Sequence, residues 1–206
     1  MCSSARANCR TGGVSKLPHY YFDIETTGLD SEKDQIITIQ FQKILFGDGT
    51  PEEPLTILKC WEYDGREEKM LNEIAPLIMA NNPFKFVPVG NNLNFEFKFL
   101  LSKISKHLKI EMDPLYFHSR PHIDLKHVMI LLNGGRFKGY NLFLKKIESG
   151  INVPCWYHNK DYLRITKYIE MEAEAFTNFY NYVVMQIFSP ELGHLILNRE
   201  ESKSLV

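Results

Sequence analysis

Cysteine is scarce in this 206-residue chain, and its four copies never form a C-x-x-C pair (Cys2, Cys9, Cys60 and Cys155). This spacing gives neither a disulfide framework nor a zinc finger. No apolar run approaches the roughly 20 residues that a membrane-spanning helix needs, and no signal-peptide core lies near the start. We therefore expect an intracellular, cytoplasmic protein in a reducing environment, with no membrane partner.

A strong net charge is also missing, since the formal value is −1, which argues against a strongly basic nucleic-acid binder. The charge is nevertheless uneven along the chain. Residues 23–75 hold thirteen acids and five bases, a net of −8, whereas residues 120–167 hold nine bases and three acids, a net of +6. This asymmetry fits an anionic substrate approached from one side, and it fits a solvated basic face equally well.

The most informative segment of the chain is FDIETTGL, residues 22–29, in which an apolar run ends in two carboxylates at alternate positions. On a strand, Asp23 and Glu25 would project from the same face and repel each other. A divalent cation between them removes this repulsion, and hard oxygen ligands suit Mg²⁺ or Mn²⁺. The alternative is a polar strand end that runs into a turn.

The remaining pattern predicts an α/β domain over residues 18–190, with a disordered tail at 1–17 and a C-terminal tail at 191–206. Strands are predicted at 19–25, 35–46, 55–61 and 84–89, and helices at 67–80, 94–108, 124–132, 140–149 and 166–188. Together these elements indicate a mixed sheet flanked by helices.

Two further segments carry acids at positions of interest. Glu96 lies near the start of the helix that follows the 84–89 strand, one position off the apolar stripe, where it would border the core without being buried. Tyr168 and Glu172 are four residues apart and share one face of the last helix, at a half-buried position. The simpler alternatives are an ordinary N-terminal helix acid and a solvated run of glutamates.

Taken together, the three segments resemble the DEDD superfamily of 3′→5′ exonucleases, the DnaQ-like, ribonuclease H-like nucleases. FDIETTGL matches the first motif, and GNNLNFEFKFL is similar to the second, with Asn92 and Phe95-Glu96 at its usual Asn and Phe-Asp positions. Tyr168-x-x-x-Glu172 resembles the third motif of the tyrosine branch, because the histidine branch would need His where Lys167 stands. The resemblance spans residues 18–190.

This resemblance implies a ribonuclease H-like mixed five-stranded sheet and hydrolysis of phosphodiester bonds in single-stranded DNA or RNA from the 3′ end, releasing nucleoside 5′-monophosphates. It implies two Mg²⁺ or Mn²⁺ ions about 4 Å apart. Asp23 would bridge them, Glu25 and Glu172 would hold the ion that activates water, Glu96 would serve the second, and Tyr168 would orient the water. The terminal nucleotide would be bound around Thr26, Thr27, Gly28, Leu29 and Asn92.

The chain departs from the motifs at Glu96 and Glu172, where the family has Asp. The extra methylene moves a carboxylate by about 1 Å, which can cost about a hundredfold in rate. A catalytically inactive exonuclease-fold module that binds nucleic acid or acts as a scaffold is therefore the alternative function. Single strands could stack on Phe137, Tyr140, Trp156 and Tyr157, although such aromatics are more often core residues. The choice between DNA and RNA, the oligomeric state and any protein partners stay open.

Overall fold

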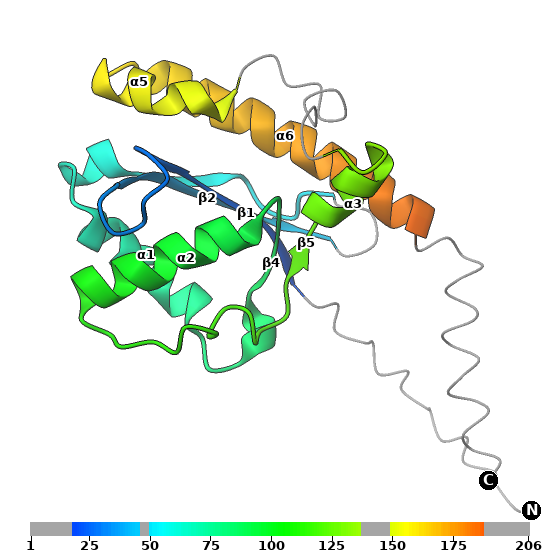
Figure 1. Ribbon diagram of the computed structural model, residues 1–206, viewed down its shortest axis with the longest axis horizontal. Coiled ribbons are helices and arrows are strands. Elements are labelled where there is room, and N and C mark those ends of the chain that lie inside the picture. The colour runs from blue at the N-terminus through cyan, green and yellow to red at the C-terminus, as the bar shows by residue number, and fades with distance from the viewer. Residues whose placement is uncertain (1–17, 46–49, 137–148, 188–206) are drawn as a thin grey trace, which may run out of the picture.

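The chain folds around a central five-stranded sheet with strand order β3-β2-β1-β4-β5, as the computed structural model shows (Figure 1). The structure describes residues 18–45, 50–136 and 149–187. The central strand β1 (His19–Thr26) is antiparallel to β2 (Ile36–Ile44) and parallel to β4 (Val87–Gly90). The outer strands are β3 (Thr56–Lys59), antiparallel to β2, and β5 (Ile123–Asp124), parallel to β4. The expected mixed five-stranded sheet is confirmed.

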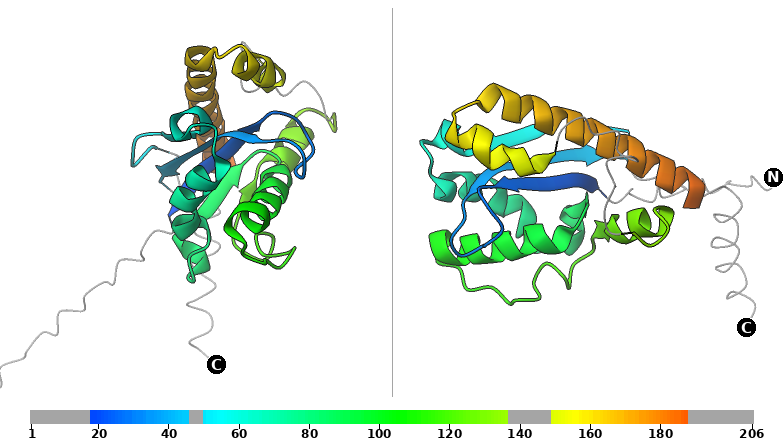
Figure 2. Two further views of the ribbon diagram at one scale, coloured as in Figure 1. Left: turned by 90° about the vertical axis from the view of Figure 1, so that its left-hand side faces the viewer. Right: turned by 45° about the horizontal axis from the view of Figure 1, so that its top comes forward.

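Helices cover both faces of this sheet (Figures 1 and 2). One face carries α1 (Glu67–Ile78) and α2 (Leu93–Lys103), and the other carries α5 (Val153–His158) and the long α6 (Tyr162–Ile187). The short α3 (Lys126–Leu132) follows β5. Single turns of other helix types occur at Cys60–Tyr63, Pro83–Lys85, Ile104–Leu108 and Gly150–Asn152. Among the described residues, no helix combines the length and apolar character that crossing a bilayer requires.

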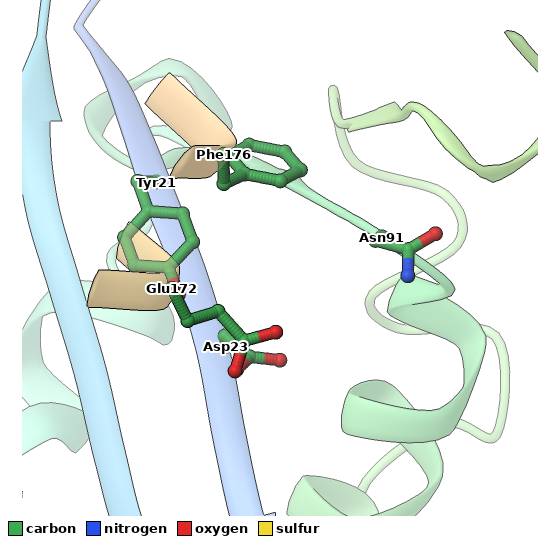
Figure 3. Close-up of a pocket in the computed structure, with 5 residues that line it drawn as sticks. All are labelled: Tyr21, Asp23, Asn91, Glu172 and Phe176. Carbon is green, nitrogen blue, oxygen red and sulfur yellow. The ribbon is translucent and has the colours of Figure 1, made fainter. Parts of the chain in front are cut away.

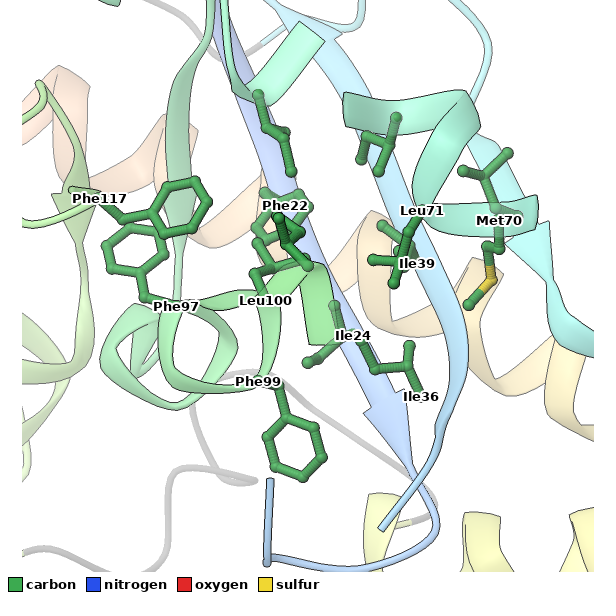
Figure 4. Close-up of a cluster of buried hydrophobic side chains, with 14 of the residues drawn as sticks. Phe22, Ile24, Ile36, Ile39, Met70, Leu71, Phe97, Phe99, Leu100 and Phe117 are labelled. Carbon is green, nitrogen blue, oxygen red and sulfur yellow. The ribbon is translucent and has the colours of Figure 1, made fainter. Parts of the chain in front are cut away.

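Side-chain alternation along β1 assigns its residues to the two faces. Phe22 and Ile24 are buried against α1 and α2, in a core that also contains Phe99 and Leu100 (Figure 4). Tyr21 packs on the opposite face against Phe176 of α6, with ring centroids 5.2 Å apart. Because successive strand residues point to opposite faces, Asp23 and Glu25 share the α6 face with Tyr21.

Several element boundaries differ from the sequence expectations. β5 occupies Ile123–Asp124, where the helix expected at 124–132 was to begin, so α3 starts at Lys126. The long C-terminal helix begins at Tyr162, four residues earlier than expected, and the six-residue α5 was not predicted. The strand expected at 84–89 is shorter, since β4 begins at Val87. Of the helix expected at 140–149, residues 140–148 lie outside the described residues.

Candidate metal centre

Three carboxylates from the two ends of the chain meet on the α6 face of the sheet. Asp23 and Glu25 come from β1 and Glu172 comes from α6, and one oxygen of each lies within 4.8 Å of the others. Figure 3 shows the Asp23 and Glu172 carboxylates next to each other, with the Tyr21 ring reaching from β1 toward them. In the part of the chain that the structure describes, no other group of three metal-ligating side chains is this close. Asp23 and Glu25 therefore project from the same face of β1, as their alternate spacing in the sequence predicted.

Glu96 approaches this cluster from the first turn of α2. Its side chain is only 4% exposed, so the expectation of an unburied position at the border of the core was wrong. Burial raises the pKa of Glu96 well above its usual value, and the charge of Asp23, to which it hydrogen-bonds, raises it further. Its Oε2 atom has no hydrogen-bond partner in the structure. Glu96 therefore touches the cluster through Asp23 and lies outside the close group of three.

The tight turn after β4 explains how Glu96 comes so near. A Cβ atom on Gly90 would lie 2.7 Å from the carbonyl oxygen of Phe22, so only glycine lets the end of β4 approach β1 this closely. Asn92, the residue before α2, adopts a left-handed conformation with φ of 70°. The chain consequently reverses at once and directs the first turn of α2 toward Asp23.

Tyr168 lies one helical turn before Glu172 on α6 and is 4% exposed. Its ring packs edge-on against Trp156, with centroids 5.8 Å apart. Its hydroxyl lies against the backbone of Gly150, where a Cβ would be 3.0 Å from the Tyr168 oxygen and 3.5 Å from Oε2 of Glu25. The phenol and the Glu25 carboxylate thus meet at Gly150, a residue that was not among the predicted site residues.

A second contribution that the sequence did not reveal comes from β2. The side-chain amide of Gln40 donates to Oδ2 of Asp23 at 2.8 Å, and the Thr38 hydroxyl donates to Oε1 of Gln40 at 3.0 Å. Both β2 residues are fully buried. The only sequence signal was the presence of polar residues in an otherwise apolar strand.

A small cavity of about 30 Å³ opens beside the carboxylates, lined by Tyr21, Asp23, Asn91, Glu172 and Phe176 (Figure 3). The Tyr21 hydroxyl and Oδ1 of Asn91 have no hydrogen-bond partner in the structure. Burial raises the pKa of Tyr21 well above its usual value, and the charges of Asp23 and Glu25 raise it further, so the phenol stays protonated and can donate. The cavity is large enough for one water molecule or one small ion.

The end of β1 and the turn that follows it contain four of the predicted substrate-binding residues. The Thr27 amide donates to the Gln35 carbonyl at 2.8 Å, and the Thr26 hydroxyl donates to the Gly28 carbonyl at 2.6 Å. The Thr27 amide is therefore used within the turn. The Leu29 side chain is 83% exposed, which is unusual for a large apolar residue beside a buried polar site.

Asn92, the fifth predicted substrate-binding residue, links two turns at the sheet edge. Its backbone amide donates to Oδ1 of Asp124 at 2.9 Å, and its Oδ1 accepts from the Lys126 ammonium at 2.5 Å. Asp124 Oδ1 also accepts from the Lys126 amide at the start of α3. This network holds one cationic side chain against the residue that precedes α2, the helix of Glu96.

Of the aromatic residues proposed for base stacking, the two that the structure describes do not form an exposed platform. Trp156 is only 7% exposed, with the Arg164 guanidinium 4.6 Å from its ring centroid, so it is a core residue as the alternative interpretation held. Tyr157 packs against Trp61, with centroids 6.3 Å apart. Phe137 and Tyr140 lie outside the described residues.

Comparison with known proteins identifies the superfamily of the chain. A family model of the RNase H superfamily matches residues 20–167, and the chain belongs to that superfamily. No curated protein sequence matches it. Among solved structures, it is similar to E. coli exonuclease I in complex with a dA13 oligonucleotide (14% identity, TM-score 0.44) and to exonuclease I from Methylocaldum szegediense (15% identity, TM-score 0.45). Each alignment covers 59% of this chain and 31% or 30% of the exonuclease I chain. The chain thus matches under a third of those structures.

Proposed function

We propose that this protein is a metal-dependent 3′→5′ exonuclease of the DEDD tyrosine branch, acting on single-stranded DNA or RNA and releasing nucleoside 5′-monophosphates. The observation that carries the proposal is the group of Asp23, Glu25 and Glu172 oxygens within 4.8 Å, beside the Tyr168 hydroxyl. A structural surface cluster would not be partly buried with a phenol held against it. Membership of the RNase H superfamily supports the same conclusion.

The residues present fit divalent metal ions. All donors are hard carboxylate oxygens, which suit Mg²⁺ and Mn²⁺. Glu96 is buried against Asp23 with an unpartnered oxygen, and such a pair requires either a proton or a cation between the carboxylates. Asp23, Glu25 and Glu172 would hold one ion, and Asp23 and Glu96 would hold a second. When bound, the ions would polarise the scissile phosphate and lower the pKa of the attacking water.

Protein groups would orient the reactants around this centre. The Tyr168 ring is fixed by Trp156 and Gly150, so its hydroxyl can hold the attacking water in one direction. The exposed Leu29 side chain would pack against the terminal base, and the backbone amides of Gly28 and Leu29 would contact its phosphate or sugar. Asn92 would act through Lys126, whose ammonium group it holds near the anionic substrate.

The two glutamates in place of aspartates do not by themselves exclude activity. Glu172 reaches the other two carboxylates despite its longer side chain. Its helix position, one turn after the buried Tyr168, therefore accommodates the additional methylene group. This supports an active centre over one in which the ligands have lost contact.

The proposal is tested with 5′-labelled single-stranded DNA and RNA incubated with Mn²⁺, Mg²⁺ or EDTA. We expect a metal-dependent ladder that shortens from the 3′ end, and at least a hundredfold loss in Asp23→Ala and Glu172→Gln. Glu174→Gln is the matched control, because Glu174 is an exposed acid on the same helix and the change in charge is identical. Absence of cleavage by folded protein with either metal would contradict the proposal.

One observation favours the inactive alternative. Glu96 lies outside the close group of three and hydrogen-bonds to Asp23, an arrangement that a shared proton can stabilise without metal. Titration calorimetry with Mn²⁺ separates the two functions. A folded protein that binds single-stranded oligonucleotides but no Mn²⁺ would be a binding module.

A further inference from the structure

We propose that Gln40 is a positioning residue of this centre, which fixes the orientation of the Asp23 carboxylate through a buried hydrogen-bond relay that begins at Thr38. The inference rests on the proposed function, because Asp23 is taken as the ligand shared by both metal ions. It adds to that function a residue from a strand that contributes no metal ligand of its own.

The strand register places Gln40 at this position. In the antiparallel pairing of β1 and β2, Gln40 is directly opposite Asp23 and Thr38 is directly opposite Glu25. Directly opposed residues point to the same face with Cβ atoms about 5 Å apart. The Gln40 side chain therefore reaches the carboxylate across the strands, and its amide nitrogen lies 2.8 Å from Oδ2 of Asp23.

Burial makes this contact energetically important. Gln40 and Thr38 each have 0% exposure, and a buried amide that lacks hydrogen-bond partners strongly destabilises the folded state. Both ends of the amide are satisfied, since Nε2 donates to Asp23 and Oε1 accepts from the Thr38 hydroxyl at 3.0 Å. A buried glutamine in a strand is thus paired entirely within the relay.

The relay has a defined direction. An ionised carboxylate only accepts hydrogen bonds, so the amide must present its NH₂ group to Asp23 and its oxygen to Thr38. The carboxylate therefore fixes the orientation of the amide, and the Thr38 hydroxyl, which can donate or accept, donates to the amide oxygen that faces it. Asp23 is held by a donor that has no charge of its own, whereas a lysine at position 40 would compete with a metal ion for the carboxylate.

This arrangement predicts a specific effect on metal binding. Partners that hydrogen-bond to metal ligands typically contribute 10- to 100-fold in metal affinity. In Gln40→Met, which keeps the length of the side chain but removes both hydrogen bonds, we expect the affinity for Mn²⁺ to fall about tenfold or more. In Gln40→Glu the loss should be greater, because a second acceptor then faces Asp23.

The matched control is Gln42→Met, in the same strand. Gln42 donates to the backbone carbonyl of Glu53 at 3.0 Å and is partly exposed. Its substitution therefore removes an equivalent side chain that does not contact Asp23. Thr38→Val and Thr38→Ser provide a second pair. The valine variant should weaken Mn²⁺ binding less than Gln40→Met does, and the serine variant, which keeps the hydroxyl, should bind like the wild type.

Calorimetric titration with Mn²⁺ and thermal unfolding are measured for every variant, and the cleavage rate is measured against Mn²⁺ concentration. A positioning role raises the Mn²⁺ concentration needed for half-maximal rate and leaves the maximal rate within a fewfold of wild type. Wild-type affinity in folded Gln40→Met, or an equal loss in Gln42→Met, would overturn the role of Gln40 while leaving the nuclease intact. If the wild type binds no Mn²⁺, the metal centre and this inference both fail.

Discussion

Replacing Gly150 with alanine would separate the geometry of the centre from the stability of the fold. The new Cβ would lie 3.0 Å from the Tyr168 hydroxyl, whereas ordinary contacts begin near 3.4 Å, so the phenol must move by a few tenths of an ångström. A misplacement of about 1 Å can cost about a hundredfold in rate, and a shift of this smaller size corresponds to roughly fivefold. We expect this loss in the maximal rate of 3′-end cleavage.

Stability should change little in the same variant. Gly150 is not in the left-handed region, so alanine fits its backbone and restricts the unfolded chain, a gain of about 0.4–1 kcal/mol. Gly134→Ala is the opposite control. Its φ is 64° with open space around the Cβ position, so it should lose about 1–2 kcal/mol of stability and keep full activity.

Activity is measured with a labelled single-stranded oligonucleotide at saturating Mn²⁺, and stability by urea unfolding. We expect opposite patterns in the two variants, with activity reduced in Gly150→Ala and stability reduced in Gly134→Ala. Full activity in Gly150→Ala would show that Tyr168 does not act at the position seen here. A parallel fall of stability and rate in that variant would trace the loss to the fold instead.

Three further predictions concern stability. Burial lowers the pKa of His19 below 6.5, so near this pH the folded protein binds fewer protons than the unfolded chain, and its stability falls as the pH drops below about 6.5. The slope is at most about 1.4 kcal/mol per pH unit. His19→Leu should flatten it in unfolding curves measured between pH 7.5 and 5.5. Glu67→Leu leaves the buried Ile36 amide without its acceptor and should cost about 1–3 kcal/mol by urea unfolding, and an unchanged midpoint would refute that role. Phe22→Ala removes a ring that is 1% exposed and should cost about 3–5 kcal/mol, so a smaller loss would indicate that the core collapses around the gap.

The sequence predicted those features that depend on local pattern. Period-two alternation in residues 19–25 placed Asp23 and Glu25 on one face of a strand, and four-residue spacing placed Tyr168 beside Glu172. Both relations follow from the geometry of a single element. The mixed sheet also followed, because long apolar strands and amphipathic helices alternate along the chain.

Features that depend on tertiary contact were not predictable in the same way. β5 has two residues, and only pairing with β4 makes it a strand. The burial of Glu96 results from the approach of Asp23 across the Gly90 turn, which no helical periodicity encodes. Nothing in the sequence distinguished Gln40 from the other polar residues of β2, and only the register puts it opposite Asp23.

The distribution of the cluster along the chain has a consequence for how the protein matures. Asp23 lies in β1 and Glu172 in α6, so about 150 residues must be synthesised between them. Contacts with such wide separation form late, because the entropy of closing the long intervening loop is lost first. A nascent chain can pair its early strands on the ribosome but cannot complete the acidic cluster until α6 docks across the sheet. Completion of the cluster therefore reports completion of the fold, because a chain that ends before α6 has Asp23 and Glu25 but lacks Glu172.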